Sequence, residues 1–226
     1  MTMPLLRARA VAKSFGATPA LRGADLDVAA GEVLAVMGPS GSGKSTLLHC
    51  LAGILRPDQG EMWYEDRRLD QLSERERSQL RRDEFGFVFQ FGQLVPELPV
   101  AENVMLPLLL GGRHRREARA AAAALLDRLD LAGLERRRPG ELSGGQAQRV
   151  AVARALVGRP RVIFADEPTG SLDSLSGEKV MDLLVDSARE QGATVLLVTH
   201  EARVAAYADR EVVVRDGRVA ALATTP

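Results

Sequence analysis

Cysteine, lysine, aromatic residues and long apolar runs are all scarce in this 226-residue sequence, and its charges balance. With one cysteine, Cys50, the chain cannot form an internal disulfide, which suits a reducing compartment. Thirty basic residues against thirty acidic ones leave no net charge to draw the protein onto nucleic acid or anionic lipid. No run approaches the roughly 18 apolar residues of a membrane span, and residues 1–10 lack the apolar stretch of a signal peptide. If the protein serves a membrane, we expect it to do so by binding something embedded there.

Nearly all basic residues are arginine, and lysine occurs only at positions 13, 44 and 179. A genome rich in G and C is the favoured explanation, because alanine is also abundant. The arginines gather at 113–119 and again at 136–138, which could indicate a surface for phosphate backbones. Acidic residues lie among them, so we interpret both clusters as solvated helix faces and predict no nucleic-acid partner.

Three short apolar runs organise the predicted fold: Val33–Met37, Val162–Ala165 and Val195–Val198. Each is too short for a helix, contains β-branched residues and shows no alternation of polar with apolar positions. That pattern is expected for strands buried on both faces of a parallel sheet. Polar or glycine residues follow each run at once. Because ligands bind at the carboxyl ends of strands in open α/β sheets, we predict that the three runs deliver these residues to one site.

The two ends of the chain favour β-structure, whereas its middle favours helices. Short strands are predicted over Leu5–Val11, Ala24–Val28, Met62–Tyr64, Glu211–Val214 and Arg218–Leu222. Apolar residues and alanines predict helices over Gly111–Asp130 and Gln146–Val157. One domain fits this pattern, with a mixed α/β core, a small β region and an inserted helical region.

A glycine-rich loop follows the first buried run. It satisfies the Walker A pattern G-x-x-x-x-G-K-[ST] with Gly38, Pro39, Ser40, Gly41, Ser42, Gly43, Lys44, Ser45 and Thr46. Glycines let backbone N–H groups turn inward around an anion, and the helix opened by Ser45 directs its positive end at phosphates. Lys44 adds a cation for the β- and γ-phosphates, and the Ser45 hydroxyl can ligate Mg²⁺. A glycine-rich turn without a ligand is disfavoured, because the pattern directly follows a buried strand.

Two acids end the second buried run, and a histidine follows the third. Asp166 and Glu167 form a candidate Walker B element: Asp166 would hold Mg²⁺ through its water shell, and Glu167 would orient and deprotonate the attacking water. Adjacent acids at a strand end are often only surface residues, and a lone histidine is more often structural. Together with the Walker A loop, however, the two acids are typical of a P-loop NTPase. His200 would then lie where it could bond the γ-phosphate.

A further motif narrows the class of NTPase. Leu142–Gln146 reads Leu-Ser-Gly-Gly-Gln and precedes a predicted helix, so it forms a second helix N-terminus that suits phosphate. On these residues the sequence resembles the ABC ATPase family over essentially its whole length. The resemblance makes Leu142–Gln146 the signature motif, Gln90 the Q-loop glutamine, Ser171–Asp173 the D-loop, His200 the switch histidine and Phe15 the aromatic that stacks on adenine. For Phe15, packing in the core is the alternative role.

The family resemblance implies a fold, ligands and site residues. The fold would be a P-loop NTPase (RecA-like) core with a small antiparallel β subdomain, over 1–84 and 158–226, and an inserted α-helical subdomain, over 85–157, that carries the Q-loop and the signature helix. ATP would contact Phe15, the Walker A loop and the signature residues Ser143, Gly144, Gly145 and Gln146. The ligands of Mg²⁺ would be Ser45, Gln90 and Asp166, and the catalytic residues would be Glu167, His200 and Gln90.

The resemblance also implies how the protein works. Two copies would pair head to tail, so that Ser143 and Gly145 of one copy cover the γ-phosphate held by the Walker A loop of the other. ATP would join the copies, and hydrolysis at Glu167 would release them. No catalytic motif is degenerate, so a homodimer should have two working sites.

The stretch from Leu72 to Leu108 resembles the ABC subgroup that serves lipoprotein release, macrolide and peptide export, and bacterial cell division. The chain departs from that subgroup at Gly92, Gln93, Pro99 and Ala147. The resemblance implies an export-type or mechanotransmission-type ATPase subunit at the cytoplasmic face of the cell membrane, bound to an integral membrane permease through the Q-loop and helical region. One alternative is a mechanical ABC ATPase that moves no substrate, as in cell division. The other is a soluble ABC ATPase of DNA repair or translation, which usually carries zinc modules, coiled coils or a second cassette.

Overall fold

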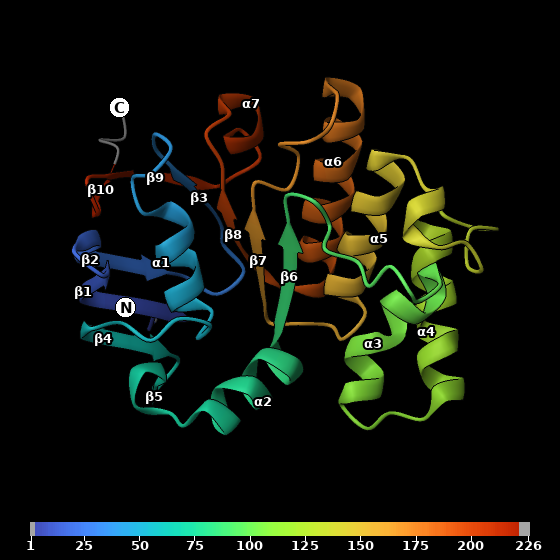
Figure 1. Ribbon diagram of the computed structural model, residues 1–226, viewed down its shortest axis with the longest axis horizontal. Coiled ribbons are helices and arrows are strands. Elements are labelled where there is room, and N and C mark those ends of the chain that lie inside the picture. Colours follow the sequence, from blue (N-terminus) through green and yellow to red (C-terminus); the bar gives the residue numbers. More distant parts are fainter. Residues whose placement is uncertain (1–2, 222–226) are drawn as a thin grey trace. The chain divides into compact units, whose positions relative to one another are not determined.

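The computed structural model describes residues 3–221 (Figure 1). The chain forms two compact units. The first runs up to Arg81 and resumes at Thr194, and the second runs from Arg82 to Ala193. In chain order, the first contains β1 (Leu6–Phe15), β2 (Thr18–Val28), β3 (Val33–Met37), α1 (Lys44–Leu51), β4 (Gln59–Tyr64), β5 (Arg67–Arg68), the start of α2 (Glu74–Glu84), β8 (Thr194–Val198), α7 (Ala202–Ala205), β9 (Arg210–Arg215) and β10 (Arg218–Ala221). The second contains β6 (Phe85–Phe89), α3 (Val100–Leu110), α4 (Arg115–Arg128), α5 (Gly144–Leu156), β7 (Val162–Asp166) and α6 (Ser174–Gln191). The predicted subdomain boundaries at 84/85 and 157/158 stay a prediction.

The first unit combines an antiparallel sheet with parallel strands. β2, β1, β4 and β5 form the antiparallel sheet in that order, which confirms the β-structure predicted near the termini. β3 lies between β8 and β9 and runs parallel to both, while β10 pairs antiparallel with β9. Four of the five β3 residues and all of β8 are buried, as their unbroken apolar sequences predict. Of the predicted strand Arg218–Leu222, Leu222 lies outside the described residues.

The second unit packs helices around a parallel strand pair. β6 pairs with β7 from Phe85 opposite Val162 to Phe89 opposite Asp166. The ring of Phe164 stacks on Phe87, with centroids 5.6 Å apart. α5 packs against β6 and α6, and α3 and α4 pack against each other and against α5 (Figure 1). The apolar run of β7 and the predicted helix Gln146–Val157 are both confirmed, the latter as α5.

The predicted helix over Gly111–Asp130 is wrong at its start. α3 ends at Leu110, and α4 begins only at Arg115. Gly112 has φ 82°, a left-handed conformation that interrupts a helix and favours glycine. The four residues from Gly111 to His114 therefore connect two helices. Among residues 3–221, no helix has the length and the apolar character needed to cross a membrane.

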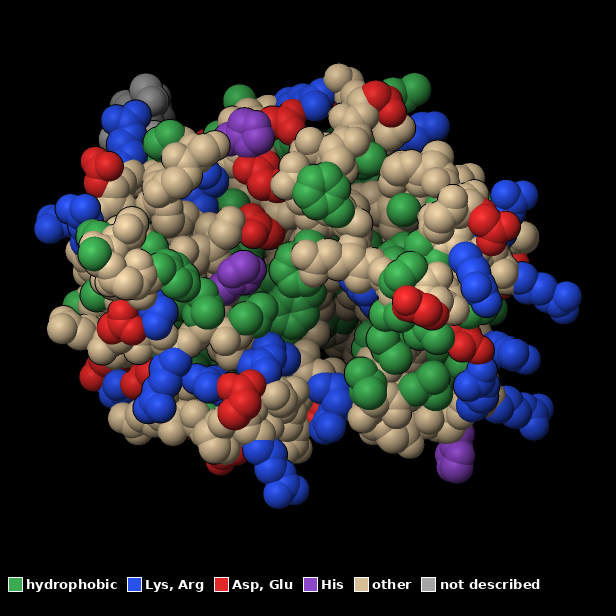
Figure 2. Space-filling model, in the orientation of Figure 1, with side chains coloured by type: hydrophobic (Ala, Val, Ile, Leu, Met, Phe, Trp, Pro, Cys, Tyr) green, Lys and Arg blue, Asp and Glu red, His purple; other side chains and the backbone are tan. Residues whose placement is uncertain are grey.

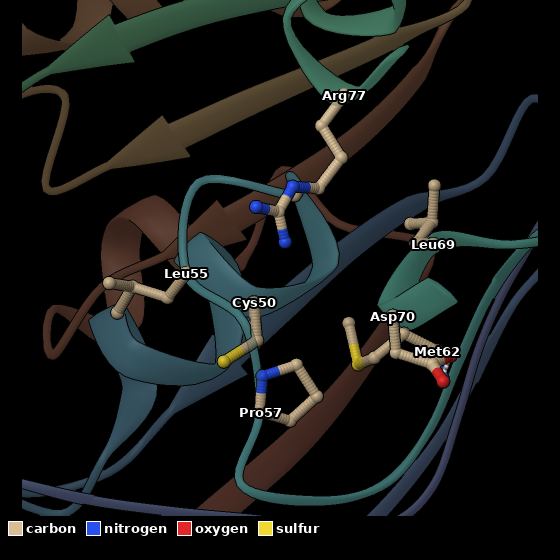
Figure 3. Close-up of a pocket in the computed structure, with 8 residues that line it drawn as sticks. Cys50, Leu55, Pro57, Met62, Leu69, Asp70 and Arg77 are labelled. Atoms are coloured by element: carbon tan, nitrogen blue, oxygen red, sulfur yellow. Dashed lines mark hydrogen bonds between the residues drawn. The ribbon is translucent and has the colours of Figure 1, made fainter. Parts of the chain in front are cut away.

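Cys50 lies on α1, in a small pocket that Leu55, Pro57 and Met62 also line (Figure 3). Its thiol is buried, and burial raises the pKa of this thiol to about 12. Only the thiolate reacts with alkylating agents, so we expect iodoacetamide to leave Cys50 unmodified in the folded protein at a pH well below that value. Mass spectrometry before and after unfolding in guanidinium checks this. Rapid alkylation of the native chain would show that the pocket opens.

Candidate nucleotide-binding site

The Walker A loop connects β3 to α1 in the first unit. Gly38 has φ 143°, and a Cβ built there would lie 2.2 Å from the carbonyl oxygen of Val214. Gly43 has φ 105°, and its Cβ would lie 2.4 Å from the carbonyl oxygen of Ala20. Heavy atoms do not approach so closely, so only glycine fits at these two positions without moving the backbone. The glycines of the motif thus fix the path of the loop.

Lys44 and Ser42 give this loop the character of an anion site. The Lys44 side chain is buried, and its Nζ donates to the carbonyl oxygens of Gly38 and Pro39, each at 2.9 Å. These partners are neutral and leave the positive charge of the ammonium in place. Ser42 Oγ is buried and makes no hydrogen bond within the described chain. Buried groups of this kind suit an anion that brings acceptor oxygens, so the loop fits a nucleotide phosphate.

The first unit also places His200 at the carboxyl end of β8, beside the end of β3 where the Walker A loop begins. β3 and β8 are parallel neighbours with Val36 opposite Val198, so Gly38 and Thr199 leave the sheet at the same end. The backbone N–H of Thr199 donates to the carbonyl oxygen of Val36 at 3.2 Å, which extends this pairing up to His200. The His200 side chain is exposed. The prediction that the first and third apolar runs end at a common edge is therefore confirmed.

Phe15 ends β1 with a side chain that is 53% exposed. This exposure rules out packing in the core, the alternative role for Phe15. Lys13 Nζ lies 6.0 Å from the ring centroid, while it also forms an ion pair with Asp58 at 2.7 Å. An exposed ring at the end of a strand is open to a planar ligand such as a nucleobase.

In the second unit, the parallel pairing of β6 with β7 places Gln90 and Glu167 together. Phe89 pairs with Asp166, so the residues that follow each strand leave the same edge. A Cβ on Gly170 would lie 2.9 Å from Gln90 Nε2, so the glutamine side chain packs closely on this glycine. Glu167 has φ 48°, a left-handed conformation that costs a non-glycine residue about 1–2 kcal/mol and is often found at functional sites.

The signature residues form the N-terminus of α5. Ser143 is the N-cap, and its Oγ accepts from the backbone N–H of Gln146 at 3.2 Å. In return, Gln146 Oε1 accepts from the backbone N–H of Ser143 at 2.9 Å, which completes a capping box. Ser143 is exposed and can still donate its hydroxyl hydrogen. The side-chain carbonyl of Gln146, by contrast, is engaged in holding the helix start.

The signature glycines pack against the D-loop side of α6. A Cβ on Gly144 would lie 3.4 Å from Leu172 Cδ2, and one on Gly145 would lie 3.2 Å from Ser176 Cβ. Asp173 caps α6 by accepting from the backbone N–H of Ser176 at 3.0 Å. Hydrogen bonds from the Ser176 side chain and backbone hold the pKa of Asp173 below its usual value. The signature motif and the D-loop thus form one continuous part of the second unit.

Sequence reasoning missed two residues that contact the Q-loop backbone. Gln148 Nε2 donates to the carbonyl oxygen of Phe89 at 2.9 Å, and Arg154 donates to those of Gly92 and Gln93. Gln148 is a polar residue on the buried face of α5. A glutamine among the apolar positions of a predicted helix is the sequence signal for this contact, because a buried amide needs a hydrogen-bond partner.

The sequence matches the ABC transporter family over residues 21–170. The chain therefore belongs to the ABC transporter family, as an ATP-binding subunit that hydrolyses ATP to drive transport together with a membrane permease. ATP and Mg²⁺ are its ligands, and cassettes of this family work as dimers. The fold class, the family and the activity inferred from the motifs are thereby confirmed.

The similar proteins support the subgroup as well. The lipoprotein-releasing system ATP-binding protein LolD 2 of Caulobacter vibrioides is 45% identical over 97% of this chain and 98% of its own length. The macrolide export ATP-binding/permease protein MacB of Agrobacterium fabrum is also 45% identical, over 96% of this chain and 34% of its own length. The dimeric structure of MJ0796, a bacterial ABC transporter cassette, has a TM-score of 0.88 at 38% identity and covers 97% of this chain and 100% of its own. The predicted resemblance to the lipoprotein-release and macrolide-export subgroup is confirmed.

Proposed function

We propose that two copies of this chain bind ATP between them. In this proposal the Walker A loop of one copy holds the phosphates, and Ser143 and Gly145 of the other copy cover the γ-phosphate. The observation that carries the proposal is that the Walker A loop and the N-terminus of α5 both present hydrogen-bond donors. Within residues 3–221, the buried ammonium of Lys44 bonds only to carbonyls of the loop, and the capped start of α5 presents an exposed hydroxyl that can still donate. Each offers donors to an anion from a separate part of the chain.

In this proposal, separate groups of site residues bind the base, bind the phosphates and catalyse hydrolysis of one nucleotide. Phe15 stacks on adenine, and the loop from Gly38 to Thr46 surrounds the phosphates. Ser45, Gln90 and Asp166 would hold Mg²⁺, and the ion would offset the charge on the phosphates. Glu167 accepts the proton of the attacking water, and His200 and Gln90 position that water. Gln146 acts indirectly, because its side chain stabilises the helix start that carries Ser143.

The membrane partner is proposed to bind at the Q-loop and α3, within the second unit. Phe91 is 74% exposed and Leu110, at the end of α3, is 65% exposed. Figure 2 shows hydrophobic side chains gathered over α3 on this face. Large apolar side chains in contact with water favour burial by a partner. We infer that an integral membrane permease covers Phe91, so that the chain is held at the cytoplasmic face of the membrane.

Co-purification tests this assignment. The chain, expressed with the permease encoded beside its gene, should be isolated with that membrane protein, and mass spectrometry identifies it. We expect Phe91→Ser to weaken the complex about tenfold or more, because burial of a phenylalanine contributes roughly 1.5–3 kcal/mol.

ATP affinity should not change in Phe91→Ser. Met3→Ser is the matched control, since Met3 is 62% exposed and lies in the first unit. Equal binding by both variants would place the interface elsewhere. Isolation of a membrane protein devoted to cell division would favour the mechanical ATPase over the transporter subunit.

A further inference from the structure

The backbone of the Q-loop segment, defined here as residues 89–93, is fully engaged as a hydrogen-bond acceptor. Its carbonyl oxygens accept as follows: Phe89 from Gly92 N at 3.0 Å and Gln148 Nε2 at 2.9 Å, Gln90 from Ser171 Oγ at 2.9 Å, Phe91 from Gln93 N at 2.7 Å, Gly92 from Arg154 Nη2 at 2.6 Å, and Gln93 from Arg154 Nη1 at 2.7 Å. Loops usually leave many carbonyls to water. In the Q-loop segment, by contrast, every backbone carbonyl accepts a hydrogen bond from the protein.

Three of these carbonyls are held by the helix that carries the signature motif. Gln148 is 2% exposed, and the guanidinium of Arg154 has only neutral carbonyls as partners among the described residues. Burial lowers the pKa of Arg154, whose side chain is half-buried. Hydrogen bonds from a charged donor are stronger than neutral ones, so Arg154 is the main tie between α5 and the loop.

Packing reinforces the same connection. A Cβ on Gly92, which has φ 67°, would lie 3.4 Å from Gln148 Oε1 and 3.5 Å from Ala151 Cβ. The loop backbone therefore rests directly on α5. In contrast, the side chain of Phe91 in the same segment points to solvent and is 74% exposed. One face of the segment is thus fixed to α5 while its aromatic side chain stays accessible.

We propose that Arg154 and Gln148 are positioning residues that join the Q-loop segment to α5, so that a partner bound at Phe91 moves the loop and Ser143 as one body. α5 is a single uninterrupted helix of 13 residues from Gly144 to Leu156, with Ser143 as its N-cap. A displacement at its Arg154 end is therefore transmitted to its N-terminus. This inference rests on the proposed function, in which Ser143 covers the nucleotide of the other copy. By linkage, closure of the dimer on ATP would in turn alter the affinity for the partner at Phe91.

Amide hydrogen exchange in the nucleotide-free chain tests the connection itself. Arg154→Met keeps an unbranched side chain and removes the donors, so the amides of Gly92 and Gln93 should exchange about tenfold faster or more. Arg149→Met is the matched control, because Arg149 lies on the same helix and donates to the carbonyls of Leu129 and Asp130, outside the Q-loop segment. Arg154→Lys should give an intermediate rate. Equal exchange in Arg154→Met and Arg149→Met would overturn the inference.

Dimer formation tests the consequence. In a Glu167→Gln background, Arg154→Met should need several-fold more protein to form the ATP dimer, while ATP affinity measured on the monomer stays unchanged. A lowered ATP affinity, or normal dimerisation despite faster exchange, would contradict transmission to Ser143. If Arg154→Met does not fold, Gln148→Met takes its place, with faster Gly92 exchange as the required result. Failure of Glu167→Gln alone to dimerise would count against the proposed function and leave the exchange result intact.

Discussion

Glu167→Gln is expected to bind ATP like the unmodified chain while its hydrolysis falls about 10²–10⁴-fold, the usual contribution of a general base. Glutamine has the same length and shape but cannot accept the proton of the attacking water. Glu167 follows β7 directly and has φ 48°, so the backbone holds it in one defined place. With turnover arrested, ATP should remain bound and the two copies should stay together. Gel filtration with and without ATP, together with phosphate release, measures both effects.

Glu178→Gln is the matched control for this experiment. Glu178 is an exposed residue on α6, in the same unit as Glu167. It should hydrolyse ATP normally and form no lasting dimer. If Glu167→Gln stayed monomeric in ATP, the proposed arrangement of two copies around the nucleotide would be wrong. If it hydrolysed ATP at the normal rate, Glu167 would lose its role as the base.

The parts of the fold that depend on local apolar pattern could be predicted from the sequence. β3, β7 and β8 are short, unbroken apolar runs because both faces of each strand are buried. α6 has equally clear signals, although the predicted helices do not include it. Asp173 caps its start, Gly192 ends it with φ 69°, and its buried residues recur at helical spacing. α3 is also absent from the predicted helices, and its sequence signal is weaker, because Pro107 lies inside it and an internal proline normally argues against a helix.

The parts of the site that could be predicted from the residues themselves are those built from consecutive residues. The Walker A loop and the signature motif are of this kind, because a turn and a helix N-terminus are built from neighbours in sequence. The tie between Arg154 and the carbonyls of Gly92 and Gln93 joins residues about sixty positions apart. Any donor of sufficient length could bond a backbone carbonyl, so such a pair leaves no motif. The left-handed conformation of Glu167 has no local signal either, because glutamate seldom adopts a positive φ.

Lys44→Ala is expected to weaken ATP binding about 10–150-fold or more, since a hydrogen bond to a charged group contributes roughly 1.5–3 kcal/mol. Lys44 is 7% exposed and donates to Gly38 and Pro39 within the loop. Its removal therefore takes away both a cation for the phosphates and two ties that shape the loop. Isothermal calorimetry with ATP measures the loss.

A second variant separates the contribution of the ammonium group from that of the apolar stem of Lys44. Lys44→Met keeps the buried stem and removes the charge and the donors, so it should lose as much affinity as Lys44→Ala while filling more of the space. Lys179→Ala is the control, because Lys179 is exposed on α6 and should bind ATP normally. Undiminished affinity in both Lys44 variants would remove Lys44 from the site. A loss in Lys44→Ala alone would mean that its stem supports the loop and that its charge does not meet the phosphates.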